Sequence, residues 1–283
     1  MSAVIDQIRQ RIGTFPAMPV FCQKLAAKLN DPDVDFSVLS DAIKYDPGMT
    51  TDVLRFANSA YFGIPHPVHS LQEAIVRIGL NKIMQLVLAL QVASSLRKPM
   101  LGYQLQPEEL LKHSAWVAVS AEEFCKTIHI PIPEIIFTAG LLHDMGKVIL
   151  DEFVLGHRAD IEAVVRDKAL THVEAESVML GINHAEVGAL VLEQWRFPKE
   201  LMEAARWHHH PQRAIHYPAI SNIVHLANAL AHSAGIGAGI EEAAYNPDPT
   251  IMEKLNVTTV IIEQVASKTL DKMNAIHALL SEG

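Results

Sequence analysis

Apolar residues recur along most of the chain at intervals of three or four positions, which is the period of an amphipathic α-helix. A sustained alternation of apolar and polar residues, as in a half-buried strand, is not found. The segment from Ile83 to Leu96 is apolar around most of its circumference, which is typical of a buried helix. The pattern therefore predicts an all-α protein built as a multi-helix bundle.

Capping residues and prolines set the bounds of these predicted helices. Ser70 with Glu73, and Thr171 with Glu174, have the spacing of capping boxes at helix starts. Prolines and capping residues delimit further helices. Those expected are at residues 20–29, 36–45, 107–129, 183–195, 199–208 and 219–232.

The helical pattern breaks at residues 97–106, where Pro99 and Gly102 interrupt it. We expect this break to divide the chain into an N-terminal helical lobe, residues 1–100, and a second helical lobe, residues 101–283.

Composition narrows the classes of function. With 283 residues and 49% hydrophobic content, the chain can bury one large core or two modest ones. Its net charge of −9 and its lack of clustered Lys and Arg argue against a nucleic-acid partner. The longest apolar run is interrupted by Gln85 and Gln91 and is shorter than the roughly 20 residues that cross a bilayer, so no membrane partner is expected. We expect a cytoplasmic protein without a disulfide framework, because Cys22 and Cys125 lie far apart within predicted helices.

Candidate chemistry begins at His143-Asp144, where an apolar helical run over residues 137–147 becomes polar. A nitrogen and an oxygen ligand from adjacent residues suit a divalent metal ion. Metal-type side chains also occur on three other predicted helices, and four helices of a bundle can converge on one cavity. These additional candidates are His113, His184, His208 and His209.

Each candidate also has a purely structural interpretation. His113 fits a partly buried helix position, His184 a helix start, and residues 208–210 a solvated helix end. Lys147, about one turn beyond Asp144, suits either a bound phosphate or the C-terminal end of a helix dipole. The ordered set, rather than any single residue, favours a metal site.

The order of these residues resembles the HD-domain superfamily of metal-dependent phosphohydrolases, whose pattern is a His, a His-Asp pair and a later Asp. His113 fits the first position and His143-Asp144 the pair, while His184, His208 and His209 resemble the extra histidines of the HD-GYP branch. Upstream segments make the chain similar, over roughly residues 13–232, to the HDOD family of HD-related output domains in bacterial signalling proteins. These segments are residues 15–19, 29–32, 46–47, 54–63 and 74–80.

The resemblance implies a metal site but leaves catalysis open. Asn228 stands where the superfamily places its last Asp ligand, and an amide oxygen is a weaker ligand than a carboxylate. The nitrogen-rich set His113, His143, Asp144, His184, His208, His209 and Asn228 suits one or two divalent transition-metal ions, with Fe or Mn favoured over Zn or Ni. The leading hypothesis is a bacterial signal-transduction module that acts on a signalling protein. The alternative is a metal-dependent phosphohydrolase, a phosphodiesterase that acts on nucleotides or cyclic dinucleotides, with Asp144 and Lys147 as catalytic residues and a phosphorylated small molecule as its partner.

Overall fold

The computed structural model describes residues 2–18, 22–25, 47–59, 61–237, 239–241 and 246–281. Across these ranges all regular secondary structure is helical, apart from one isolated bridge between Met100 and Leu105. The predicted all-α bundle is therefore confirmed. The helix expected at residues 36–45, and all but residues 22–25 of the one expected at 20–29, lie outside the described residues.

The described helices follow one another as α1 (Ser2–Thr14), α4 (Pro47–Ala57), α5 (Leu71–Ile78), α6 (Leu80–Leu96), α7 (Glu109–Thr127), α8 (Ile136–Leu142), α9 (Gly146–Gly156), α10 (Arg158–Lys168), α11 (His172–Leu180), α12 (His184–Gln194), α13 (Lys199–Trp207), η1 (Pro211–Arg213), α14 (Pro218–Ser233), η2 (Gly239–Glu241), α15 (Pro249–Lys254) and α16 (Thr259–Ser281).

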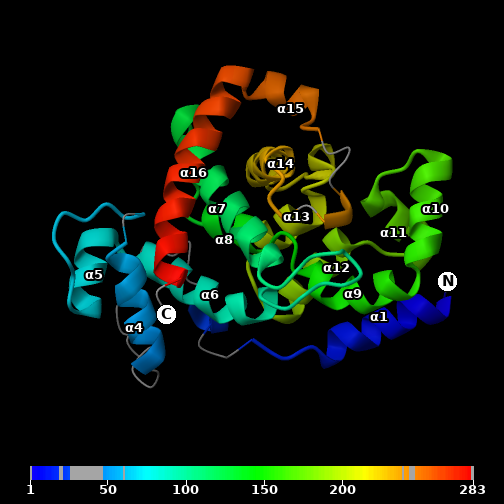
Figure 1. Cartoon of the computed structure of the whole chain (residues 1–283), viewed down its shortest axis with the longest axis horizontal. Helices are drawn as coiled ribbons and strands as arrows, with labels where there is room; N and C mark the ends of the chain where they lie inside the picture. The colour runs from blue at the N-terminus through cyan, green and yellow to red at the C-terminus, as the bar shows by residue number, and fades with distance from the viewer. Residues whose placement is uncertain are drawn as a thin grey trace.

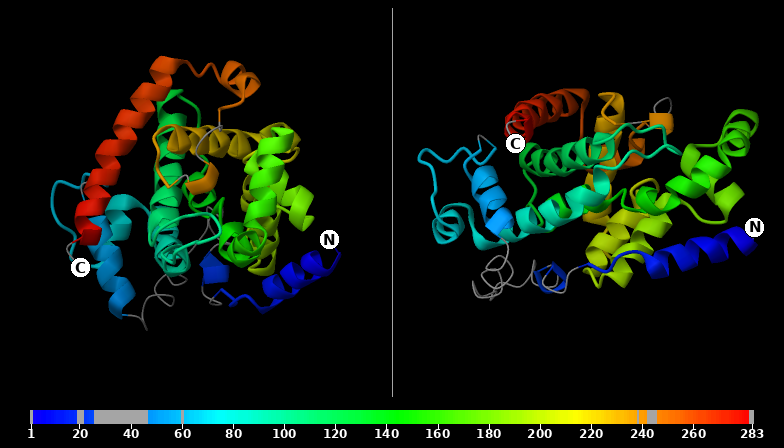
Figure 2. Two further views of the ribbon diagram at one scale, coloured as in Figure 1. Left: turned by 45° about the vertical axis from the view of Figure 1, so that its right-hand side comes forward. Right: turned by 60° about the horizontal axis from the view of Figure 1, so that its bottom comes forward.

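Helix α7 forms the centre of the bundle, with α8, α14 and α16 packed against it (Figure 1). Its buried positions run from Leu110 to Cys125 and include His113. Helix α16 lies along α7 in each view of Figure 2, and Lys272 of α16 forms an ion pair with Glu123 of α7 at 2.7 Å. A second group, α9, α12 and α13, packs beside this centre.

The N-terminal segment is attached to the second group of helices. Helix α1 packs on α9 and α12. After α1, the ring of Phe15 stacks on Trp195 with centroids 5.6 Å apart, and Trp195 Nε1 donates a hydrogen bond to the Pro16 carbonyl. Phe15 and Pro16, which belong to a segment that resembles HDOD domains, thus anchor the start of the chain to the bundle.

Helices α4, α5 and α6 pack on one another, and α6 also contacts α7 and α8. Between α4 and α5, the Asn58 side chain donates to the Val68 carbonyl and accepts from the Val68 N–H, which fixes the intervening loop. The proposed division of the chain at residue 100 stays a prediction.

A helix begins at each of the two predicted capping boxes, but only one of the two boxes forms as predicted. Thr171 and Glu174 form the predicted capping box at α11. Ser70 caps α5 as expected, but the Glu73 carboxylate accepts from the His69 N–H and not from that of Ser70. A further capping box, in which Asn183 begins α12, was not predicted.

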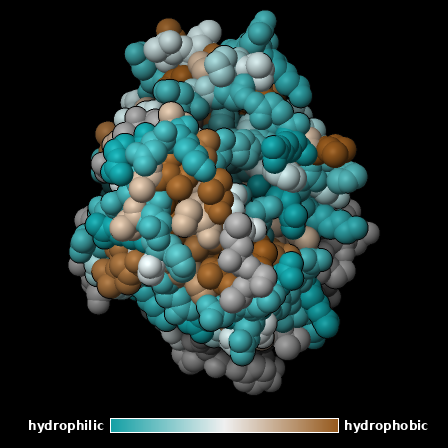
Figure 3. All heavy atoms as spheres, turned by 90° about the vertical axis from the view of Figure 1, so that its right-hand side faces the viewer, coloured by the Kyte–Doolittle hydropathy of each residue, from teal (hydrophilic) through white to brown (hydrophobic). Residues whose placement is uncertain are grey.

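The surface on the side of α10 and α11 is mainly hydrophilic, with hydrophobic side chains gathered near its middle (Figure 3). Among the described helices, none has by itself the length and apolarity needed to cross a membrane. Helices α5 and α6 have them only when taken together, and this pair is bent by 118°.

Candidate metal centre

The His143-Asp144 pair lies in a break between two helices. Helix α8 ends at Leu142 and α9 begins at Gly146, so both side chains leave the backbone where the apolar run stops. His143, Asp144 and Lys147 are nevertheless all at least 98% buried. The predicted polar end of a core helix is therefore present, but it faces the interior of the bundle.

Two glycines allow the helices around this break to approach closely. A Cβ atom on Gly146 would lie 1.8 Å from the His184 carbonyl oxygen, so no side chain fits between α9 and α12. A Cβ atom on Gly140 would lie 2.6 Å from the Cα of Ala118, so α8 and α7 also meet backbone to backbone. These contacts bring together α7, which carries His113, the α8–α9 break, which carries His143 and Asp144, and α12, which carries His184.

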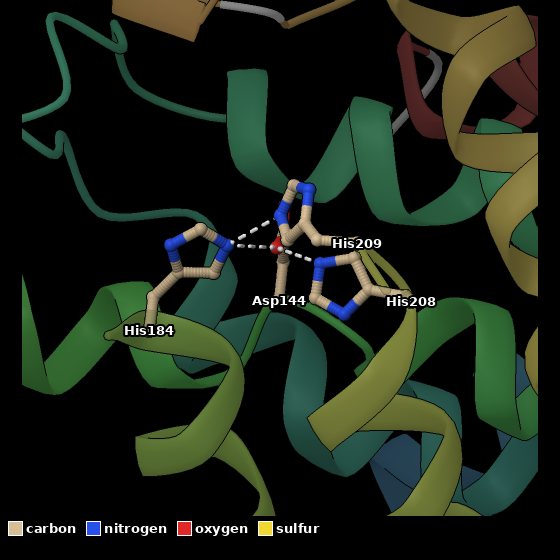
Figure 4. A group of neighbouring side chains, drawn as sticks. All are labelled: Asp144, His184, His208 and His209. Atoms are coloured by element: carbon tan, nitrogen blue, oxygen red, sulfur yellow. Dashed lines mark hydrogen bonds and ion pairs between the residues drawn. The ribbon is translucent and has the colours of Figure 1, made fainter. Parts of the chain in front are cut away.

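The Asp144 carboxylate is the centre of the cluster. Its Oδ1 atom lies 3.5 Å from both His184 Nε2 and His208 Nε2. Its Oδ2 atom lies 3.4 Å from His143 Nε2 and 3.5 Å from His113 Nε2. Each oxygen of one carboxylate thus faces a different pair of imidazoles, and Figure 4 shows the Oδ1 side of this arrangement.

His209 completes the set on the Oδ1 side, because its Nε2 lies 2.9 Å from His184 Nε2 (Figure 4). Ligand atoms within each of two groups lie no more than 4.8 Å apart, and Asp144 belongs to both. The first group is His113, His143 and Asp144; the second is Asp144, His184, His208 and His209. This geometry matches two neighbouring cation positions that share one carboxylate.

Backbone carbonyls orient three of the imidazoles. The Nδ1 atoms of His113, His143 and His208 lie 2.8, 2.7 and 2.7 Å from the carbonyl oxygens of Ile236, Gly140 and Ala205. A carbonyl oxygen only accepts, so each Nδ1 carries the proton. In a neutral imidazole this leaves the Nε2 lone pair directed at Asp144, as metal coordination requires.

A carboxylate orients His184. The Glu176 side chain accepts from both the backbone N–H and Nδ1 of His184, each at 2.8 Å, and from the hydroxyl of Tyr103. Glu176 is 1% exposed, so this is a buried His–carboxylate pair. Such pairs typically fix the ring and raise its basicity as a metal ligand.

The electrostatics favour neutral imidazoles at His113, His208 and His209 beside an ionised Asp144 carboxylate. Burial lowers the pKa of His113 to about 3 and the pKa values of His208 and His209 well below their usual range. Burial alone would raise the pKa of Asp144, but His143 and Lys147 outweigh it and hold that pKa well below its usual range. Deprotonated ligands of both kinds are the form that binds a cation.

The remaining predicted residues are Lys147, which contacts Asp144, and Asn228, which lies on α14, a helix packed against α7 and α8. Lys147 Nζ lies 2.9 Å from Asp144 Oδ2 and 5.5 Å from the ring centroid of Tyr103. Asn228 is buried on α14, and neither atom of its side-chain amide has a hydrogen-bond partner among the described residues. One turn later, His232 lies with its ring centroid 5.2 Å from that of His113.

Sequence reasoning missed Glu176, Tyr103 and His232. His232 follows Asn228 by four positions and so shares its helix face, a spacing that was available as a signal. Glu176 and His184 lie on different helices, α11 and α12, and Tyr103 lies in the α6–α7 connection, so no local spacing joins them.

A polar cleft of about 390 Å³ adjoins the second ligand group. His209 lines it together with Arg206, Trp207 and Arg213, and the Arg213 guanidinium lies 5.7 Å from the Trp207 ring centroid. Neither guanidinium forms an ion pair with a described residue. The lining also contains Glu174 and Glu186, so the cleft carries two arginines and two glutamates next to the histidine cluster.

The fold is shared with several solved structures. An HDOD domain protein with unknown function from Geobacter sulfurreducens is 22% identical, with a TM-score of 0.79 over 98% of this chain and 97% of that one. A Shewanella amazonensis protein whose name proposes a phosphohydrolase is 25% identical, with a TM-score of 0.69 over 96% and 97% of the two chains. A Marinobacter aquaeolei protein whose name proposes signal transduction is 20% identical, with a TM-score of 0.72 over 99% of this chain and 66% of that one.

Sequence comparison gives the family. An uncharacterized protein of Treponema pallidum is 24% identical over 232 residues, which cover 78% of this chain but 43% of that protein. The chain thus spans less than half the length of this curated relative. Residues 15–211, well over half of the chain, match the family defined by the HDOD domain. The chain belongs to the HDOD family.

Proposed function

We propose that this HDOD protein is a signal-transduction module that binds one or two divalent transition-metal ions and acts through contacts with a signalling protein. The observation that carries the metal site is the buried Asp144 carboxylate, whose oxygens each face two imidazole Nε2 atoms at 3.4–3.5 Å. The signalling role rests on membership of the HDOD family and on the name of the Marinobacter relative.

The chemistry of the cluster fits a metal. The Nε2 atoms of His113 and His143, and Oδ1 of Asp144, are buried without a hydrogen-bond partner among the described residues. A buried polar atom left without a partner costs about 1–3 kcal/mol, which a coordinated cation would offset. The nitrogen-rich set suits a transition metal better than Mg²⁺ or Ca²⁺, and among these we favour Fe or Mn over Zn or Ni.

The charge of the centre supports a role other than hydrolysis. Asp144 is the carboxylate shared by both ligand groups, and Lys147 already forms an ion pair with it. Asn228, where the superfamily places an Asp, adds no negative charge. We therefore favour a site whose metal holds the bundle in a defined conformation for recognition by a partner.

A metal-dependent phosphohydrolase is the second candidate, and the polar cleft beside His209 favours it. Arg206 and Arg213 would bind the phosphate of a small molecule there, and Lys147 and Asp144 would act at the reacting end. A metal at this centre would supply Lewis-acid activation of water and of the phosphoryl oxygen. The name of the Shewanella relative agrees with this candidate.

One experiment separates the two. Protein purified without a histidine tag and loaded with Fe²⁺ or Mn²⁺ is assayed against cyclic dinucleotides and a generic phosphodiester. We expect stoichiometric metal without turnover. Turnover that His143→Ala abolishes would replace the signalling proposal with the phosphohydrolase. The expected cytoplasmic location and the absence of nucleic-acid and membrane partners stay predictions.

A further inference from the structure

A second cavity, separate from the metal centre, lies between α6 and the pair formed by α7 and α8. Its volume is about 100 Å³, and its described lining is almost entirely apolar. Engineered apolar cavities of about 150 Å³ stay dry and bind benzene-sized ligands, so this space suits a single small apolar group. The apolar lining comprises Phe56, Phe62, Leu86, Ala89, Leu90, Ala93, Leu111, Ala115, Val119, Phe137 and Leu141.

Several lining side chains are only half-buried. Phe56, Leu90, Leu111 and Phe137 all keep part of their surface accessible. Covering apolar surface contributes roughly 25 cal/mol per Å², so an occupant that fills this space gains free energy by doing so.

Two cations contribute to the lining, one from each end of α6, and only one of them is available to a ligand. Lys82, near the start of α6, forms an ion pair with the buried Glu122. Arg97 follows α6, roughly 22 Å further along the helix axis at 1.5 Å per residue. The Arg97 side chain is exposed and forms no ion pair with a described residue. Its backbone carbonyl accepts from the Glu108 N–H, which places this end of α6 beside the start of α7.

The wall of the cavity is also the wall of the metal centre. Leu111 and Ala115 line the cavity from α7, and His113 lies between them in the sequence but points to Asp144. On α8, Phe137 and Leu141 line the cavity just before His143 and Asp144. An occupant therefore contacts the two helices that position half of the ligand set.

We propose that this cavity is a binding site for a small hydrophobic carboxylate, with its aromatic or branched apolar body between α6 and α7–α8 and its carboxylate on Arg97. The apolar lining binds the apolar body of the ligand. The Arg97 guanidinium, which forms no ion pair with a described residue, binds the carboxylate. The site does not depend on the metal, so it holds whether or not the function proposed above is correct.

The test uses 3-phenylpropionate and its uncharged amide as probes, titrated into the full chain by calorimetry with and without a chelator. We expect saturable binding of both probes in both conditions, tighter for the acid. Arg97→Gln weakens binding of the acid about tenfold and leaves the amide unchanged, because it removes a charge-assisted hydrogen bond. Ala89→Leu, which fills the cavity, weakens both probes about tenfold or more.

Ser94→Leu is the matched control, because it adds similar bulk at an exposed position of α6 that does not line the cavity. It keeps the wild-type affinities. If Ala89→Leu does not fold, as judged by circular dichroism, Ala93→Leu fills the end near Arg97 instead. The proposal is overturned if neither probe saturates, if the filling variant binds as tightly as the wild type, or if Arg97→Gln weakens acid and amide equally.

Discussion

Lys147 Nζ lies 2.9 Å from Asp144 Oδ2, and both side chains are almost fully buried. The ammonium group therefore compensates the carboxylate that both groups of candidate ligands share. A metal ion bound at Oδ2 would compete with this ammonium group for the same oxygen, so the ion pair and the metal are alternative ways of neutralising one buried charge.

Replacing Lys147 tests this competition. In the presence of a chelator, we expect Lys147→Met to lower the free energy of unfolding by about 3 kcal/mol or more, because Asp144 loses its buried partner. Added metal should recover most of this loss, so metal stabilises the variant more than the wild type. Urea unfolding with chelator and with Mn²⁺ measures both effects. The control is Lys168→Met, at an exposed lysine, which should change neither the unfolding free energy with chelator nor the stabilisation by added metal. Equal stabilisation of Lys147→Met and wild type by metal would refute the competition.

The close approach of α9 and α12 makes Gly146 irreplaceable. A Cβ at this position would lie 1.8 Å from the His184 carbonyl, whereas a Cβ on Gly156 in the same helix meets nothing within 4 Å. We expect Gly146→Ala to lower the unfolding free energy by about 3 kcal/mol and to weaken metal binding, because the helix that carries His184 must move. Gly156→Ala should be neutral or slightly stabilising. Thermal unfolding of the two variants decides the point, and similar melting temperatures would contradict it.

Glu176 is expected to act on the metal through His184. Glu176→Gln removes the negative charge from the imidazole's partner, so we expect metal affinity to fall by about 10- to 100-fold. The control is Glu174→Gln on the same helix, where the side chain serves the Thr171 capping box and does not contact His184. Its metal affinity should match the wild type. Competition with a chromophoric chelator gives the metal affinities of both variants. If Glu176 had a purely structural role, the metal affinity of Glu176→Gln would also equal that of the wild type.

Tyr61 should make stability fall at alkaline pH. Its hydroxyl donates to the buried Glu122 carboxylate at 2.9 Å. Burial, and then the charge of Glu122, raise the pKa of Tyr61 well above its usual value. Above pH of about 10 the unfolded chain loses this proton while the folded chain retains it, so stability declines by roughly 1.4 kcal/mol per pH unit from this residue.

Tyr61→Phe should therefore be about 1 kcal/mol less stable at neutral pH, where it lacks the hydrogen bond, and should lose less stability above pH 10. Urea unfolding between pH 8 and roughly pH 11 measures the slope. Tyr217→Phe leaves the contact between Tyr61 and Glu122 intact and should keep the wild-type slope. Parallel slopes for wild type and Tyr61→Phe would show that the hydroxyl does not titrate as described.

The sequence was informative where chemistry follows from local spacing. The period of apolar residues predicted the helices, and the polar helix end predicted at His143-Asp144 coincides with the end of α8 at Leu142. The start of α9 at Gly146 was not predicted, so the interpretation of Lys147 as a cation at a helix C-terminus is wrong: Lys147 lies in the first turn of α9. The sequence could not reveal that Gly146 touches the backbone of α12, because that contact joins residues far apart in the chain. The bond between Glu176 and His184 was hidden for a similar reason. The cavity between α6 and α7 depends on how the side chains of three helices pack, which no one-dimensional pattern records.

The most direct test of the metal centre is elemental analysis of the full chain, purified without a tag, loaded with metal and then desalted. The proposal predicts one or two equivalents of a transition metal in the wild type and a loss of most of this metal in Asp144→Ala. The control is His66→Ala, which changes an exposed histidine outside the cluster and should retain the full amount of metal. A wild-type protein without stoichiometric metal, or an Asp144→Ala variant with the same metal content as the wild type, would contradict it.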